Sequence, residues 1–140
     1  MESDPILGPM GALAFLTFGV LLNIPIRRFA AAASGRVRRD DFKYGESPNV
    51  PGSVSIPNRN YMNLLEAPLL FYVICLIAVH TEEATPAFVN VAWAYVALRA
   101  LHSVIHLTYN AVLHRLTVFA LSNFVLIAMW AMIYLPWIAP

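Results

Sequence analysis

Three polar side chains stand at the start of a long apolar stretch, where they could contact a charged ligand. Arg59, Asn63 and Glu66 lie at positions i, i+4 and i+7, so on a helix they share one face. Glu66 lies several residues inside the apolar run, and the next acidic residue is Glu82. If the run crosses a membrane, a carboxylate there is costly and is expected to face a protein interior or a water-filled cavity.

A second group of polar side chains follows in the next apolar stretch. Arg99, His102 and His106 lie at i, i+3 and i+7, again on one helical face, and Arg115 borders the following apolar stretch. The sequence therefore predicts that two polar helix faces point at a common zone.

Several kinds of chemistry fit these residues. Glu66 and Arg99 could pair inside a bundle, with the histidines at its interface. His102 and His106 have the spacing of helical metal ligands, but the segment HSVIH lacks the glutamate of HExxH, and the nearby arginines repel a cation. No metal is therefore predicted. A proton relay would use the same groups, yet the sequence shows no repeated halves.

The balance of charge favours an anionic ligand. The four arginines expected near this zone, Arg38, Arg59, Arg99 and Arg115, outnumber Glu66. Because arginine is always charged and offers a forked set of donors, it suits carboxylates, and Glu66 could receive an ammonium group. An amino-acid-like or peptide-like anion fits this mixture of groups.

The composition places these residues in a membrane protein. Of the 140 residues, 59% are apolar and 12% are charged, whereas about a quarter of residues are charged in soluble proteins. The mean hydropathy is +0.64, and the length suits one domain over residues 1–140. The net charge of +1 gives no reason to expect a nucleic-acid partner, and the single cysteine, Cys75, leaves no intrachain disulfide.

The apolar runs predict an all-α membrane protein with a bundle of four transmembrane helices. The expected helices cover about 5–33, 58–80, 85–109 and 113–136, with one long loop at about 34–57. Seven of the nine basic residues lie from Arg27 to Arg59, which marks this loop as cytoplasmic. Both termini are therefore expected outside the cytoplasm, with the polar zone facing the cytoplasm.

The segments RNYMNLLEAPLLF and LRALHSVIHLTYNAVLHR resemble the MAPEG family, the membrane-associated proteins of eicosanoid and glutathione metabolism. The shared pattern on the second helix is an arginine, then asparagine and glutamate three apart, followed by proline. On the third helix it is an arginine with aromatic or histidine residues three and seven further on, and another arginine opens the fourth helix. The resemblance covers all four helices, and the segment GRVRR is similar to the basic end of the family's first helix.

This resemblance implies a homotrimer that binds glutathione between neighbouring subunits on the cytoplasmic side. The compact chain suggests a bacterial-type member in the inner membrane. Glutathione would be the co-substrate of a transferase or peroxidase acting on lipophilic electrophiles or hydroperoxides that arrive from the membrane lipid. The resemblance implies that Arg115 stabilises the thiolate. It assigns the glutathione pocket to Arg38, Arg59, Asn63, Glu66, Arg99, His102 and His106. The alternative is a non-catalytic trimer that binds glutathione or another small anion.

Three positions depart from the family pattern. His106 stands where many members carry tyrosine, and Phe119 stands where some carry another tyrosine. Leu116 lacks the hydroxyl that some members place beside the arginine. Two possible donors to the thiolate are therefore absent, so glutathione or another thiol or anionic ligand could bind while turnover is weak or uses a different acceptor.

Overall fold

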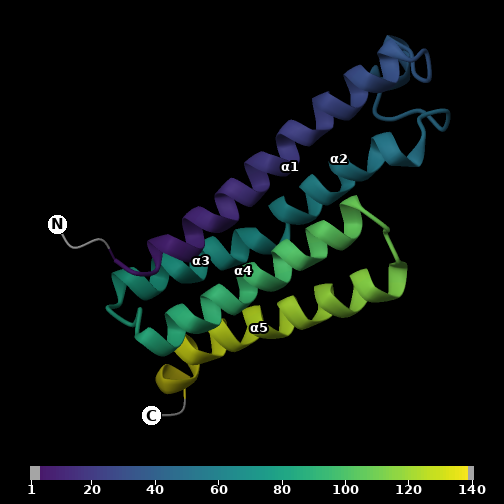
Figure 1. Cartoon of the computed structure of the whole chain (residues 1–140). Helices are drawn as coiled ribbons and strands as arrows, with labels where there is room; N and C mark the ends of the chain where they lie inside the picture. Colours follow the sequence, from purple (N-terminus) through teal and green to yellow (C-terminus); the bar gives the residue numbers. More distant parts are fainter. Residues whose placement is uncertain (1–3, 139–140) are drawn as a thin grey trace.

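The structure, a computed structural model, describes residues 4–138 and consists of helices that lie side by side (Figure 1). Four segments are long and apolar enough to cross a membrane. The predicted all-α bundle is therefore confirmed for the described residues, whereas residues 1–3 and 139–140 of the expected domain lie outside them. The helices are α1 (Leu7–Ala33), α2 (Gly52–Leu65), α3 (Ala67–His80), α4 (Pro86–Leu107) and α5 (Val112–Ile138), with a short 3-10 helix, η1 (Arg39–Phe42), in the long loop.

The second membrane segment is broken at Glu66. This residue has φ −79° and ψ −92°, outside the helical region, and separates α2 from α3. Pro68 explains the break, because its ring nitrogen has no hydrogen to donate to the carbonyl of Leu64. The predicted single helix over 58–80 is thus corrected to two helices, with Glu66 at their junction.

The start of α2 also differs from the prediction, since the helix begins at Gly52 and not at about 58. Pro57 lies inside α2 and cannot donate to the carbonyl of Ser53. Nη1 of Arg27, from α1, donates to that carbonyl at 3.0 Å. Nη2 of the same arginine donates to the carbonyl of Leu107, the last residue of α4, at 3.2 Å. Arg27 therefore completes the backbone hydrogen bonding of two other helices.

The turn between α4 and α5 is tight. α4 ends at Leu107, slightly before the predicted 109, and α5 begins at Val112. Asn110 has a φ of 48°, and its backbone N–H donates to the carbonyl of Ile105 at 2.8 Å. Asparagine adopts this left-handed conformation more readily than most residues, so it suits the end of a helix. The turn brings the first residues of α5 beside the last turn of α4.

Charged side chains hold the long loop to the end of α1. Nη2 of Arg28 lies 2.8 Å from Oε1 of Glu46 in an ion pair. The carboxylate of Asp41 accepts hydrogen bonds from the backbone N–H of Arg38 and from the Ser47 hydroxyl, each at 2.7 Å. These bonds, the backbone one first, hold the pKa of Asp41 below its usual value.

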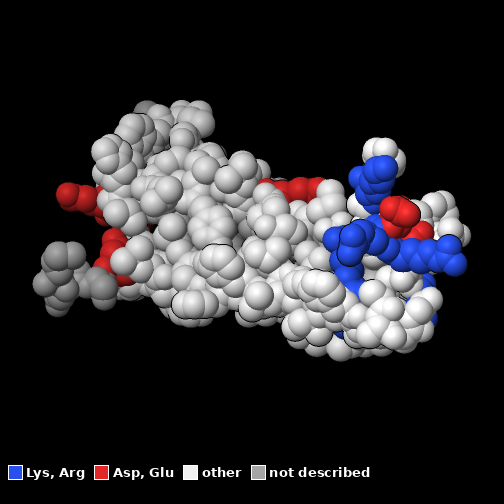
Figure 2. Space-filling model, turned by 90° about the horizontal axis from the view of Figure 1, so that it is seen from above, with Lys and Arg blue, Asp and Glu red and all other residues white. Residues whose placement is uncertain are grey.

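The surface has basic and apolar zones. Figure 2 shows lysines and arginines gathered at one end of the bundle. The α1–α2 loop and the α4–α5 turn lie at one end, while both termini and the α3–α4 turn lie at the other (Figure 1). Between the ends, large apolar side chains such as Phe15 and Phe124 are exposed by 77% and 68%, as expected of a surface that faces lipid. The chain is an integral membrane protein.

Candidate functional site

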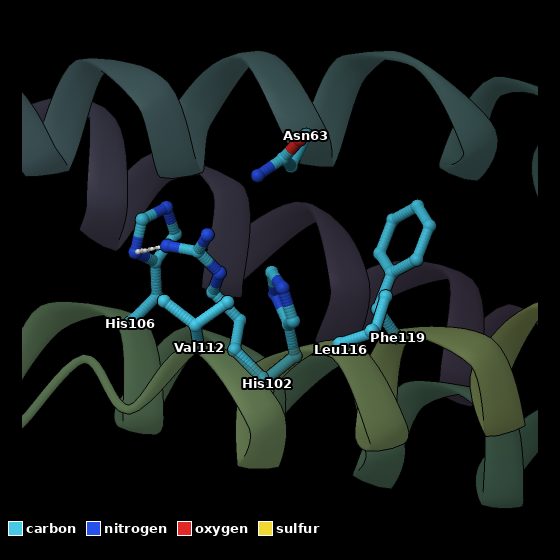
Figure 3. A pocket seen from close by; sticks show the side chains of 7 residues that line it. Asn63, His102, His106, Val112, Leu116 and Phe119 are labelled. Atoms are coloured by element: carbon cyan, nitrogen blue, oxygen red, sulfur yellow. Dashed lines mark hydrogen bonds between the residues drawn. The ribbon is translucent and has the colours of Figure 1, made fainter.

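One pocket is lined by four of the eight site residues that the sequence predicted. It has a volume of about 260 Å³ and lies between α2, α4 and α5. Asn63 enters from α2, opposite the side chains of the other two helices (Figure 3). The residues that line the pocket are Asn63, His102, His106, Val112, Arg115, Leu116 and Phe119.

Helical spacing explains why these side chains meet. His102 and His106 lie one turn apart on α4, with ring centroids separated by 5.7 Å. Phe119 of α5 lies 5.7 Å from the His102 ring, centroid to centroid. Arg115 precedes Phe119 by one turn, so it occupies the same level of the bundle as His106. The predicted convergence of polar faces therefore holds for Asn63, the histidines and Arg115.

Arg115 is held by the end of α4. Its Nη1 donates to Oδ1 of Asn110 at 2.8 Å and lies 3.2 Å from Nδ1 of His106 (Figure 3). The side chain is half-buried. Its guanidinium is thus fixed at one wall of the pocket while part of it stays accessible.

Arg99 lies behind the pocket and is fully buried. Its Nη2 donates to the backbone carbonyl of Asn63, and its guanidinium carbon lies 5.4 Å from the centre of the Phe119 ring. Nε and Nη1 have no hydrogen-bond partner within residues 4–138. The suggested ion pair between Arg99 and Glu66 does not form. Among residues 4–138, the structure has one ion pair, between Arg28 and Glu46. The buried cation therefore keeps free donors.

Four of the predicted binding residues lie outside this pocket in the single chain: Arg99, which is behind it, and Glu66, Arg59 and Arg38. Glu66 is exposed at the α2–α3 junction, and Arg59 is exposed on α2. Arg38 is in the long loop and lines a different cavity of about 540 Å³, together with Arg28 of α1. The structure of one chain thus brings together only part of the predicted set.

Sequence reasoning missed Asn110, which contacts both Arg115 and His106. Its signal was present, because asparagine just after a helix is a common left-handed terminator. Helical spacing alone also did not predict a buried contact between α2 and α4, in which the Ser103 hydroxyl donates to Oδ1 of Asn60 at 3.3 Å. That contact fixes the helices that supply Asn63 and His102.

The described residues contain no group of three or more histidine, cysteine or acidic side chains that could hold a metal ion. The groups of the pocket are therefore an arginine, two imidazoles and an amide, set against an apolar wall. Such a set can bind an anion and exchange protons with it.

The comparison with protein families gives one clear result. The model of the MAPEG family matches residues 6–135. Neither the curated proteins nor the solved structures give a match. The matched region includes α2, α3 and α4 completely, and it contains every residue of the pocket. Because the match covers almost the whole of a four-span helical chain, the chain belongs to the MAPEG family.

Proposed function

We propose that this chain is a membrane glutathione-dependent transferase or peroxidase in which Arg115 stabilises the thiolate of glutathione. The MAPEG family includes glutathione transferases and peroxidases. The observation that carries the proposal is the Arg115 guanidinium, which is half-buried in a pocket that also holds His102, His106 and Asn63.

The charge of the site supports an anionic ligand. The pocket has no acidic residue in its lining within the described chain, and Arg115 supplies a fixed cation. Arg99 adds two unpartnered donors directly behind the wall. A carboxylate of glutathione would satisfy such donors, because a buried guanidinium without an anion is costly. Glu66, exposed at the helix junction, would receive the ammonium group.

The cation also explains how a thiol becomes reactive. A free thiol has a pKa of about 8.5, so most of it is protonated at neutral pH, and a fixed positive charge beside the sulfur favours the thiolate. The thiolate is the nucleophile that attacks an electrophile or a hydroperoxide. Arg115 is the arginine of the pocket lining, and we assign this role to it.

The apolar wall supports a lipophilic acceptor. Val112 and Leu116 line the pocket and are exposed by 66% and 58%. They connect the polar groups with the lateral surface of α5, where lipid is expected. An acceptor dissolved in the bilayer could therefore reach the thiolate without crossing water.

The assembly that we propose is a homotrimer with the glutathione site between subunits. Glu66 and Arg59 are exposed on the second membrane segment, and charged groups at that depth are expected to face protein or water and not lipid. A neighbouring subunit would cover them and complete the site. Native mass spectrometry in detergent should give a trimer; a monomer that binds glutathione equally well would exclude this assembly.

Thiolate absorbance tests the function. Purified protein mixed with glutathione near neutral pH should show ultraviolet absorbance of a thiolate, and the signal should be lost in Arg115→Ala. Arg36→Ala is the matched control, because Arg36 is an exposed arginine of the loop outside the pocket. Turnover is then followed with a lipophilic electrophile and with a lipid hydroperoxide.

Two results would contradict the proposal. Thiolate absorbance that is the same in Arg115→Ala and in the unmodified protein would remove the role of the arginine. Binding of glutathione without any thiolate would instead favour a non-catalytic protein that binds glutathione or another small anion.

A further inference from the structure

The hydrogen bonds around His106 define which of its ring nitrogens carries a proton. Both hydrogen-bond contacts of this ring within the described chain use Nδ1: it lies 2.9 Å from Oδ1 of Asn110 and 3.2 Å from Nη1 of Arg115. Nη1 of Arg115 also lies 2.8 Å from the same Oδ1. The three groups form a closed triangle at the end of α4.

The chemistry of the three groups decides which atom donates and which accepts in each contact. A guanidinium can only donate, so the atom of Asn110 at 2.8 Å from Arg115 must be the carbonyl oxygen and not the amide nitrogen. That oxygen can only accept, so Nδ1 of His106, at 2.9 Å, must carry a hydrogen. In the alternative, Nδ1 carries no hydrogen and accepts from Arg115 across the longest of the three contacts, 3.2 Å. Nδ1 of His106 and Oδ1 of Asn110 would then be two acceptors only 2.9 Å apart.

The backbone of the α4–α5 turn fixes the position of Asn110. Its φ of 48° and its N–H bond to the carbonyl of Ile105 set the direction in which the amide leaves the turn. The amide oxygen therefore lies between one residue of α4 and one of α5 before any ligand binds.

We propose that Asn110 holds His106 as the Nδ1–H tautomer, so that Nε2 accepts the proton of a thiol bound in the pocket. The inference rests on the proposed function, because it names the base for the same thiolate. The S–H bond breaks, its electron pair stays on sulfur beside Arg115, and a new N–H bond forms at Nε2. The resulting imidazolium donates through Nδ1 to Asn110, which accepts from both cations.

The proposed tautomer gives a role to His106, which stands where many family members carry tyrosine. A tyrosine at position 106 would offer a hydroxyl to the thiolate as a donor, whereas the imidazole offers an acceptor to the thiol. Asn110 is a positioning residue, since it acts through His106. His106 lines the pocket and is the group that meets the thiol.

The tautomer can be measured without glutathione. In protein with nitrogen-15-labelled histidines, spectra that couple ring nitrogens to ring hydrogens distinguish Nδ1–H from Nε2–H, and His106→Gln identifies the signal among the four histidines. We expect neutral His106 to be Nδ1–H. Asn110→Gly keeps the left-handed turn but removes the amide, so the preference should be lost, while Asn110→Asp keeps an acceptor and should retain it.

Thiolate formation is then compared in the same variants. The rate should fall by about two- to ten-fold in Asn110→Gly, the factor expected when His106 loses its hydrogen bond to Asn110, and should be retained in Asn110→Asp. Affinity for S-methylglutathione, which has no thiol proton, should not change. Tyr109→Phe is the matched control in the same turn, because Tyr109 is exposed and contacts His114 instead of the pocket.

The outcomes separate this inference from the proposed function. An Nε2–H tautomer of His106 in the unmodified protein, with normal thiolate formation, would overturn the inference alone. Loss of S-methylglutathione affinity in Asn110→Gly would also overturn it, because the residue would then act on binding. Absence of thiolate in unmodified protein would overturn the proposed function together with the proton transfer.

Discussion

Arg99 carries a positive charge into the interior of the bundle, where it forms no ion pair with residues 4–138. Its one hydrogen bond goes to the carbonyl of Asn63, which is a neutral acceptor. A buried charge with this little compensation is unfavourable for the isolated fold. We therefore propose that Arg99 serves anion binding and not the stability of the ligand-free fold.

Replacing Arg99 with methionine should separate these two roles. We expect Arg99→Met to leave the ligand-free protein unchanged or to stabilise it by about 1–4 kcal/mol, the range seen when buried ion pairs are replaced by apolar side chains. Thermal unfolding in detergent measures this, with and without glutathione. The stabilisation that glutathione is expected to give the unmodified protein should disappear in Arg99→Met.

The control for this experiment is Arg36→Met, an exposed arginine that should change neither curve. A large loss of stability in ligand-free Arg99→Met would contradict the expectation. It would mean that the guanidinium supports the helix packing by itself.

At the scale of helices, Arg27 compensates for a proline in another helix. Pro57 leaves the carbonyl of Ser53 without its helical donor, and Arg27 supplies one from α1. We expect Arg27→Met to destabilise the protein by about 1.5–3 kcal/mol, the contribution of hydrogen bonds that involve a charged group. Pro57→Ala in the same background should recover part of this loss, because alanine restores the N–H.

Unfolding of the single and double variants by heat tests the link. Pro25→Ala in place of Pro57→Ala is the control, since Pro25 lies in α1 and should give no recovery of the Arg27→Met loss. Equal recovery by both alanines would show that the effect is general helix propensity and not the Ser53 carbonyl.

The break at Glu66 separates α2 from α3 and directs the Glu66 side chain. In Pro68→Ala, the new N–H can donate to the carbonyl of Leu64, so α2 and α3 should join and the Glu66 side chain should turn away from its present direction. If Glu66 binds the ammonium group of glutathione, affinity should fall by about ten-fold or more, because a charge-assisted hydrogen bond contributes about 1.5–3 kcal/mol. Calorimetric titration with glutathione measures the change, and unchanged affinity would argue against the role of the junction.

Periodicity predicted the helices and part of the site because apolar length and helical spacing are properties of the sequence alone. His102 and His106 were placed on one face correctly, since a 3.6-residue repeat needs no tertiary information. The start of α2 could not be predicted because Gly52 and Pro57 are typical of loops. The helix that forms there is supported by Arg27, which is distant in sequence and donates to the Ser53 carbonyl. Asn110 was missed because its partners come from two helices joined by a turn whose geometry the spacing did not specify.

For the whole molecule, the charge distribution predicts the direction in which the chain crosses the membrane. Seven of the nine basic residues lie in 27–59, which covers the α1–α2 loop and the helix ends beside it. This loop lies at the opposite end of the bundle from the α3–α4 turn (Figure 1), and lysines and arginines gather at one end (Figure 2). Loops rich in lysine and arginine stay in the cytoplasm. We therefore expect the pocket, which lies toward the same end, to open to cytoplasmic glutathione, with both termini outside.

Cysteine labelling in intact cells tests this orientation. The background is Cys75→Ala, although Cys75 is buried and should react little. Lys43→Cys in the long loop should resist a membrane-impermeant maleimide until the membrane is opened, whereas Glu83→Cys in the α3–α4 turn should react at once. Both positions are exposed, so access to the reagent and not burial decides the result. Immediate labelling of Lys43→Cys with protection of Glu83→Cys would reverse the topology and would direct the pocket away from the compartment where glutathione is expected.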